Sequence, residues 1–202
     1  HNSSLKRQFD ILSSLIILTF FFPVGLIIAF IISITSKGDV FYRQERIGKD
    51  GVPFRLFKFR TMRVDSDKAG LLTVGMNDAR ITPIGRFLRK LKLDEFPQFL
   101  NVLSGEMSIV GPRPEVKKFV DLYTPEQRDV LKVSPGITDY ASLEYFNENE
   151  ILGNSIDPEK TYIEEVMPAK LELNKKYISN RTVKHDIEIM LLTFKALHGL
   201  SP

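Results

Sequence analysis

Two neighbouring carboxylates, Asp94 and Glu95, follow a segment whose only charged side chains are basic. This segment, Arg80–Lys92, carries five lysines and arginines. An Asp followed by a Glu is a common way to begin a helix, because carboxylates stabilise a helix N-terminus. That position also keeps a carboxylate ionised, as a nucleophile in aspartyl-phosphate chemistry must be. The sequence predicts a helix over Glu95–Leu103 and leaves a capping role and a catalytic role open.

Basic residues on both sides of this acidic pair suit phosphoryl chemistry. Such chemistry needs cations that neutralise the transferring group, and usually Mg²⁺ held by carboxylates and substrate phosphates. Arginine is favoured because its planar fork binds two phosphate oxygens at once. A rival interpretation is that these side chains only attract anionic lipid headgroups. The candidate phosphate-binding residues are Lys58, Arg60, Arg63, Arg86, Arg89 and Arg113.

Composition excludes several classes of site. The chain of 202 residues has no cysteine and only three histidines, so any metal must be held by oxygen ligands. The Walker, Rossmann and nucleophile-elbow motifs are missing from the sequence. Nucleic acid is not an expected partner, because a strongly apolar segment is a poor fit to that function.

The apolar segment Ile11–Ser36 contains no charged residue and is long enough to cross a bilayer. It is longer than the apolar region of a cleavable signal peptide. Pro23 lies near its middle and is expected to bend a helix there. Basic residues flank both sides, so charge does not place the two flanks on opposite faces of a membrane. A spanning helix and a re-entrant helix both remain open on the residues alone.

The remaining sequence predicts an α+β, mostly helical fold with amphipathic interfacial helices. A small β-hairpin is expected over 39–62, turning at Asp50-Gly51, and a polar loop over 64–77. Thr82 and Pro83 begin a predicted helix whose apolar residues Ile84, Phe87, Leu88 and Leu91 share one face. Its basic side chains suit either an anionic membrane surface or a solvated face of a core helix.

Later in the chain, "GPRP" at 111–114 predicts a rigid turn. Helices are expected at 115–123, 125–132, 162–177 and 186–197, with a break at "SPGIT" (134–138) and a loop-rich acidic region at 139–158. The last helix is expected to bury a face formed by Ile187, Met190, Leu191, Phe194 and Leu197.

Two regions are predicted from this pattern. Residues 1–36 form the membrane-helix region, of which 1–4 are expected to be a cloning remnant, and residues 37–202 form a single cytosolic catalytic domain.

Several blocks together resemble a known family. They are "FYRQERIGKDGVPFRLFKFRTM", "TPIGRFLRKLKLDEFPQFLNVLSGEMSIVGPRP" and "SPGIT", which follow an apolar segment with a central proline. This order is similar to that of the bacterial sugar transferases known as monotopic phosphoglycosyl transferases. The resemblance implies transfer of a sugar 1-phosphate from a UDP-sugar to polyprenol phosphate, with release of UMP. It also implies Mg²⁺, membrane lipids as partners, the cytoplasmic face of the bacterial inner membrane, and a re-entrant helix broken near Pro23.

The resemblance also implies roles for individual residues. Asp94 is expected to attack the donor's β-phosphate and to carry a covalent phospho-sugar. Glu95 is its partner, and the pair is expected to hold the metal. The cations that match basic positions of the family's motifs, and are expected to cradle phosphates, are Lys58, Arg60, Arg89 and Arg113. The chain departs from common family residues at Phe22, Asp139 and Asn174.

Two other functions stay open on the residues alone. One is a non-catalytic membrane module that binds anionic lipid, and the other is a membrane-bound phosphatase. The sugar, the glycan pathway and the oligomeric state do not follow from the sequence.

Overall fold

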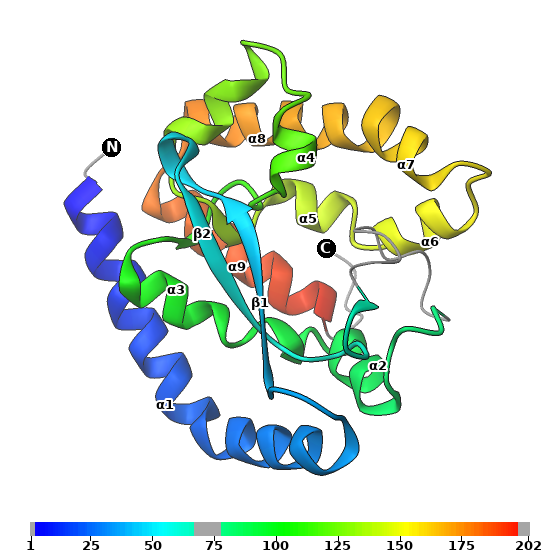
Figure 1. Cartoon of the computed structure of the whole chain (residues 1–202). Helices are drawn as coiled ribbons and strands as arrows, with labels where there is room; N and C mark the ends of the chain where they lie inside the picture. The colour runs from blue at the N-terminus through cyan, green and yellow to red at the C-terminus, as the bar shows by residue number, and fades with distance from the viewer. Residues whose placement is uncertain (1–2, 67–77, 198–202) are drawn as a thin grey trace.

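In a computed structural model, residues 3–66 and 78–197 form a mostly helical fold with two small two-stranded sheets (Figure 1). Most of the loop predicted over 64–77, and residues 1–2 of the expected cloning remnant, lie outside the described residues. The helices are α1 (Ser3–Thr35), α2 (Pro83–Lys90), α3 (Gln98–Ser104), α4 (Lys117–Val120), α5 (Tyr140–Glu144), α6 (Glu148–Gly153), α7 (Pro158–Thr161), α8 (Met167–Asn180) and α9 (Val183–Leu197). The strands are β1 (Phe41–Ile47), β2 (Pro53–Phe59), β3 (Ser108–Val110) and β4 (Gly136–Thr138). The short helical turns are η1 (Lys49–Gly51), η3 (Leu93–Glu95), η4 (Gln127–Lys132) and η5 (Tyr162–Val166).

Helix α1 is long and apolar enough to cross a membrane, and most of its apolar side chains are exposed. Pro23 lies inside it, and the ribbon changes direction part-way along its length (Figure 1). Both halves contact the remainder of the chain. Near the start, Lys6 donates to Asp186 of α9 at 2.6 Å. In the second half, Ile28 and Ile32 are buried.

The hairpin prediction is confirmed. Strands β1 and β2 pair antiparallel, from Phe41 opposite Phe59 to Ile47 opposite Pro53. The turn needs positive φ at Asp50 (57°) and Gly51 (78°), which is the reason that an Asp-Gly pair stands there.

The hairpin is also joined to α3. The side chain of Asn101 accepts from the amide of Phe57 at 3.0 Å and donates to the carbonyl of Arg55 at 2.9 Å. These bonds fix β2 against the helix that follows the acidic pair.

The helix predicted after Thr82 is also confirmed, as α2. The Thr82 hydroxyl accepts from the amide of Gly85 at 3.0 Å. A Cβ on Gly85 would lie 2.1 Å from the Thr61 carbonyl oxygen, so the close approach of α2 to the hairpin requires glycine. Of the predicted apolar face, Leu88 is buried against α1, whereas Phe87 is exposed. The face is therefore only partly covered.

The second half of the chain corrects several predictions. "SPGIT" is not only a break, because it contains β4, which pairs parallel with β3. The helices expected at 115–123 and 125–132 shrink to α4 and the turn η4, and the acidic region expected to be loop-rich holds α5 and α6. Helix α9 buries Asp186 and Ile189, whereas Ile187, Leu191 and Phe194 of its predicted buried face are exposed. The secondary structure of these segments depends on contacts with residues distant in the chain, which local sequence patterns do not report.

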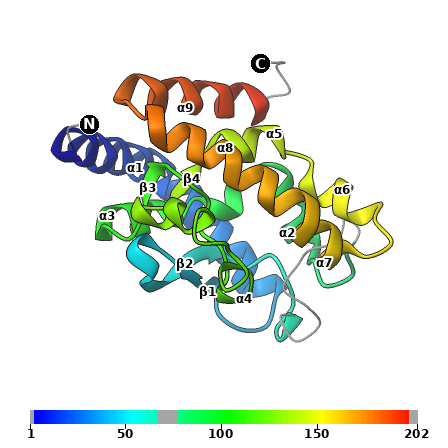
Figure 2. The ribbon, with the colours of Figure 1, turned by 90° about the horizontal axis from the view of Figure 1, so that it is seen from above.

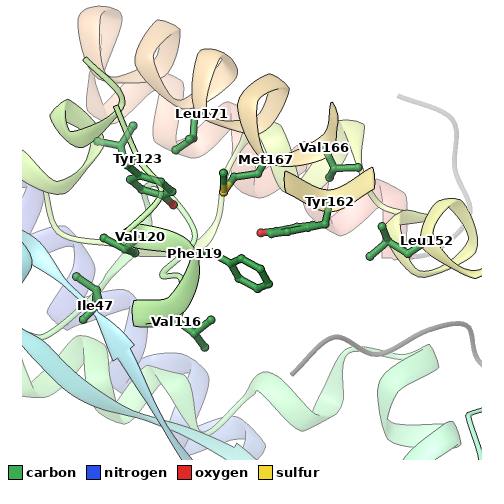
Figure 3. Close-up of a cluster of buried hydrophobic side chains, with 11 residues drawn as sticks. Ile47, Val116, Phe119, Val120, Tyr123, Leu152, Tyr162, Val166, Met167 and Leu171 are labelled. Carbon is green, nitrogen blue, oxygen red and sulfur yellow. The ribbon is translucent and has the colours of Figure 1, made fainter. Parts of the chain in front are cut away.

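Three apolar clusters form the core. The first joins β1, α4, η4 and α6 to η5 and α8, with Phe119 against Tyr162 near its centre (Figure 3). The second packs β2, α3 and β3 against α8 and α9, and α5 lies beside both of these helices (Figure 2). The third joins α1 to β2 and α2. The acidic pair lies in the chain between α2, which belongs to the third cluster, and α3, which belongs to the second.

Candidate active site

The acidic pair sits in the turn η3, and both flanks of this turn rest on α1. Leu93 packs against the cluster that contains Ile28 and Ile32. Phe96, directly after Glu95, stacks on Phe21 with 3.6 Å between ring centroids. The pair is therefore positioned by the long apolar helix as well as by its own turn.

The capping interpretation of Asp94 is wrong. Helix α3 begins at Gln98 with Pro97 as its N-cap, and this N-cap residue makes no side-chain capping hydrogen bond. Asp94 is 5% exposed, and its Oδ1 is buried with no hydrogen-bond partner among the described residues. Leaving a buried polar atom unpaired costs about 1–3 kcal/mol. An oxygen held this way is suited to meet a ligand.

Glu95, in contrast, is fully engaged by cations. Its Oε1 accepts from Lys58 Nζ at 3.0 Å and from Arg113 Nη2, and its Oε2 accepts from Arg113 Nη1 at 3.3 Å. Burial alone would raise the pKa of Glu95, but Arg113 and Lys58 outweigh it and hold that pKa well below the usual range. Glu95 is therefore the fixed anion that holds two cations in place.

The neighbouring carboxyl is shifted in the opposite direction. Burial raises the pKa of Asp94, although Lys58 and Arg89 oppose the shift. Burial also lowers the pKa of Lys58 and of Arg89. Two adjacent carboxyls whose pKa values are pushed apart are suited to different tasks. Asp94 is the more basic of the two and the better candidate nucleophile.

A cavity of about 480 Å³ opens beside the pair. Its lining combines basic residues with polar and acidic residues of α5 and α6, including Glu148, which pairs with Lys170. Its lining residues include Arg46, Lys58, Arg89, Lys92, Asp94, Glu95, Arg113, Ser142, Phe146, Asn147, Glu148 and Lys170. The cavity has the charge distribution expected for a bound diphosphate with an uncharged polar group attached.

Residues 1–199 match the family model described as bacterial sugar transferase. The chain belongs to this family. The prediction from the sequence blocks is thereby confirmed.

Named relatives of this sugar transferase share its sequence at similar levels. It is 38% identical over 195 residues to UDP-glucose:undecaprenyl-phosphate glucose-1-phosphate transferase of Escherichia coli K12, covering 95% of this chain and 40% of that protein. It is 35% identical over 198 residues to UDP-N-acetylgalactosamine-undecaprenyl-phosphate N-acetylgalactosaminephosphotransferase of Aeromonas hydrophila, covering 96% and 43%. It is 37% identical over 192 residues to the uncharacterized sugar transferase EpsL of Bacillus subtilis 168, covering 95% and 86%. The chain thus spans less than half of the first two relatives.

The structure brings together only some of the cations predicted for this sugar transferase. Lys58, Arg89 and Arg113 line the cavity beside the acidic pair. Arg60 instead donates to the carbonyl of Lys37 at 2.6 Å and lines a neighbouring cavity. Arg86 is exposed on α2 and belongs to the lining of neither cavity.

Two site residues were missed by the sequence reasoning. Asp139 is fully buried, and its Oδ2 accepts from the amide of Arg113 at 3.2 Å while its Oδ1 accepts from the amide of Ser142 at 2.6 Å. Arg46 lines the cavity and pairs with Glu115 at 3.0 Å. The departure of Asp139 from the common family residue was a usable signal for its role. The position of Arg46 in the hairpin gave no comparable signal in the sequence.

Replacing Asp139 by Ala is expected to loosen the turn that presents Arg113 and to remove the N-cap of α5. Loss of such a cap costs about 1 kcal/mol. We expect a weaker affinity for a nucleoside diphosphate, measured by isothermal titration, together with a lower denaturation midpoint. Ser155→Ala, outside the cavity lining, is the comparison variant. An Asp139→Ala protein that binds the nucleotide as wild type does would contradict the positioning role.

The donor set suits magnesium held largely by substrate. No group of three or more acidic or histidine side chains is gathered for a metal within 3–66 and 78–197. Asp94 offers one oxygen that has no hydrogen-bond partner within the described parts of the chain, whereas Glu95 is occupied by Lys58 and Arg113. Mg²⁺ commonly binds through one or two carboxylates and completes its shell with phosphates and water. The residues present fit such a site, with Asp94 as its protein ligand.

Proposed function

We propose that this chain moves a sugar 1-phosphate from a UDP-sugar to polyprenol (undecaprenyl) phosphate, giving polyprenyl diphospho-sugar and UMP. The observation that carries this proposal is a buried oxygen of Asp94 to which no described residue is hydrogen-bonded, beside a cationic cavity and on a turn packed against an apolar helix. The names of the Escherichia coli and Aeromonas hydrophila relatives support the classes of donor and acceptor. Such a reaction begins the assembly of a bacterial glycan on its lipid carrier.

In the first half-reaction, an oxygen of Asp94 attacks the β-phosphorus of the donor. The bond from that phosphorus to the bridging oxygen breaks, and UMP leaves with the bonding electron pair. Lys58 and Arg113, fixed by Glu95, and Arg89 neutralise the diphosphate during this step. When bound, Mg²⁺ would add positive charge at the diphosphate and stabilise the departing phosphate.

In the second half-reaction, a phosphate oxygen of the polyprenol phosphate attacks the phosphorus of the sugar phosphate on Asp94. The new phosphorus–oxygen bond forms as the bond to the carboxylate breaks, and Asp94 regains its electron pair. Its raised pKa makes Asp94 a better nucleophile in the first step, whereas the surrounding cations favour its departure in the second.

We also propose that α1 re-enters the membrane instead of spanning it, which places the catalytic site at the cytoplasmic face of the inner membrane. Lys6 near the start of α1 contacts α9, and Ile28 and Ile32 in its second half pack near the hairpin. A spanning helix would carry its first turns to the opposite side of the bilayer from the domain that these residues contact. A bend at Pro23 lets both halves face the same domain.

The reaction is tested with the protein in nanodiscs, a panel of UDP-sugars, polyprenyl phosphate and Mg²⁺, with UMP as the readout. We expect one stoichiometric burst of UMP without acceptor and continuous release with it. A non-catalytic lipid-binding module would bind liposomes but release no UMP. A phosphatase would hydrolyse the donor continuously without acceptor. Either of these two results would overturn the proposal.

Removing divalent cations with EDTA is expected to lower the rate of the UMP burst by about 10²-fold or more, because the negative charges of the donor's diphosphate would then meet the acidic pair without the metal. Restoring Mg²⁺ should restore the burst, and Ca²⁺, which prefers more ligands, should restore less of it. Full activity in excess EDTA would show that the protein's own cations suffice.

A further inference from the structure

A second basic cavity adjoins the first one. Its volume is about 320 Å³, and three cations, Arg46, Lys58 and Arg89, line both cavities. The additional charged residues in its lining are Arg60, Arg63, Asp65 and Arg80. Among the described residues, six cations and one carboxylate thus line the second cavity, and none of its lining residues belongs to α5 or α6.

The second cavity lies on the side of the site nearest the second half of α1. Arg60 reaches the carbonyl of Lys37, just after α1, at 2.6 Å. Phe59, in the same lining, is buried against Ile28 and Ile32. Two residues of this lining, Phe59 and Arg60, therefore contact the second half of α1 and the residue that follows it closely in the chain.

We propose that this second cavity receives the phosphate group of the polyprenyl phosphate acceptor, an inference that rests on the proposed function. After UMP leaves, an oxygen of the acceptor's phosphate must attack the phosphorus opposite its bond to Asp94, so the acceptor needs a cationic approach to this face that the sugar does not occupy. The three shared cations connect the two cavities. Arg60 and Arg63 supply the charge that is specific to the second cavity, and its position beside α1 suits a phosphate carried on an apolar chain.

Two single variants, Arg60→Gln and Arg63→Gln, test the assignment. Each is expected to raise the KM for polyprenyl phosphate by about 10-fold, as loss of one charge-assisted contact would. The amplitude and rate of the UMP burst without acceptor should stay within twofold of wild type. Arg55→Gln, exposed on the same hairpin and outside both linings, is the matched control.

A reciprocal variant separates the two cavities. Lys170→Gln removes a cation that lines the first cavity but not the second. It should change the donor's KM while leaving the acceptor's KM unchanged. Matching thermal denaturation midpoints for all variants would show that each of them folds.

Several results would overturn the inference. Unchanged acceptor KM values in both arginine variants would do so, as would a burst impaired as strongly as acceptor use.

Competing inorganic phosphate and phosphatidylglycerol vesicles test the source of the phosphate group. If phosphatidylglycerol competes as well as polyprenyl phosphate, the cavity is a general headgroup site and the assignment is wrong. If wild type releases no UMP at all, the proposed function itself is wrong. The burst assay on wild type detects this before any variant is compared.

Discussion

Replacing Asp94 by Asn is expected to lower the rate of sugar-phosphate transfer by about 10⁶-fold, the scale seen when a nucleophile is removed from a catalytic group that acts as a unit. The carboxamide keeps the size of the side chain but is a poor nucleophile toward phosphorus. Single-turnover UMP release measures the effect. Mass spectrometry of wild type with donor alone should show an adduct of one sugar phosphate on the peptide containing Asp94, and the variant should show none.

The same substitution is expected to leave the fold intact or to stabilise it. Burial raises the pKa of Asp94 in the folded protein, so this group favours folding below the pKa of the unfolded chain. That contribution is lost as the pH rises through the folded value. At neutral pH, wild type therefore holds a carboxylate whose ionised form is penalised by burial, and Asn removes this penalty. Urea denaturation in detergent should show an advantage for the variant that grows from about pH 4 to pH 7.

The comparison variant is Asp121→Asn, which alters an exposed carboxylate paired with Lys117 on the surface. It should keep both activity and stability, because exposed pairs contribute little. Near wild-type transfer by Asp94→Asn, or a phospho-sugar adduct on another residue, would remove Asp94 from the role of nucleophile. A large loss of stability would instead indicate a structural role for its carboxylate.

Local signals in the sequence predicted the elements that hold the site. Asp50-Gly51 between aromatic stretches was sufficient to predict the hairpin, because the turn is determined by those two residues. Thr82 and Pro83 likewise began a helix where the structure has one. The acidic pair itself was found from its position after a purely basic segment.

The properties that distinguish Asp94 from Glu95 could not be predicted in this way. They depend on groups distant in the chain, since Lys58 comes from β2 and Arg113 from the segment after β3. The orientation of Arg113 depends in turn on Asp139, beyond β4. A helix pattern around the pair predicted a cap, whereas packing of Leu93 and Phe96 on α1 produced a tight turn instead. Tertiary contacts determine which cations lie beside the acidic pair, and the spacing of residues in the sequence does not reveal these contacts.

Glu95→Gln is expected to have the opposite effect on stability from Asp94→Asn. The substitution leaves Lys58 and Arg113 close together without their shared anion, and breaking a buried ion pair costs about 3 kcal/mol. Transfer should also fall, by about 10²-fold, because the two cations no longer hold the geometry that neutralises the diphosphate. Urea denaturation and the UMP burst measure the two losses.

The pH dependence makes this prediction distinct. Arg113 and Lys58 hold the pKa of Glu95 well below its ordinary value, so Glu95 stabilises the fold above the pKa of the unfolded chain. That contribution is lost as the pH falls through the folded value. Glu95→Gln should therefore be less stable than wild type by an amount that shrinks on acidification. Asp94→Asn should be more stable than wild type by an amount that also shrinks on acidification.

A surface pair supplies the control for Glu95→Gln. Glu172→Gln breaks an exposed pair with Lys175 on α8 and should change stability by less than about 1 kcal/mol. Adding Lys58→Met to Glu95→Gln should recover part of the lost stability without recovering activity, because it removes one uncompensated charge but also one phosphate-binding group. If Glu95→Gln were as stable as wild type at neutral pH, Glu95 would not be the anion that organises the site. Two adjacent carboxyls would then share one role, and the assignment of attack to Asp94 alone would lose its physical basis.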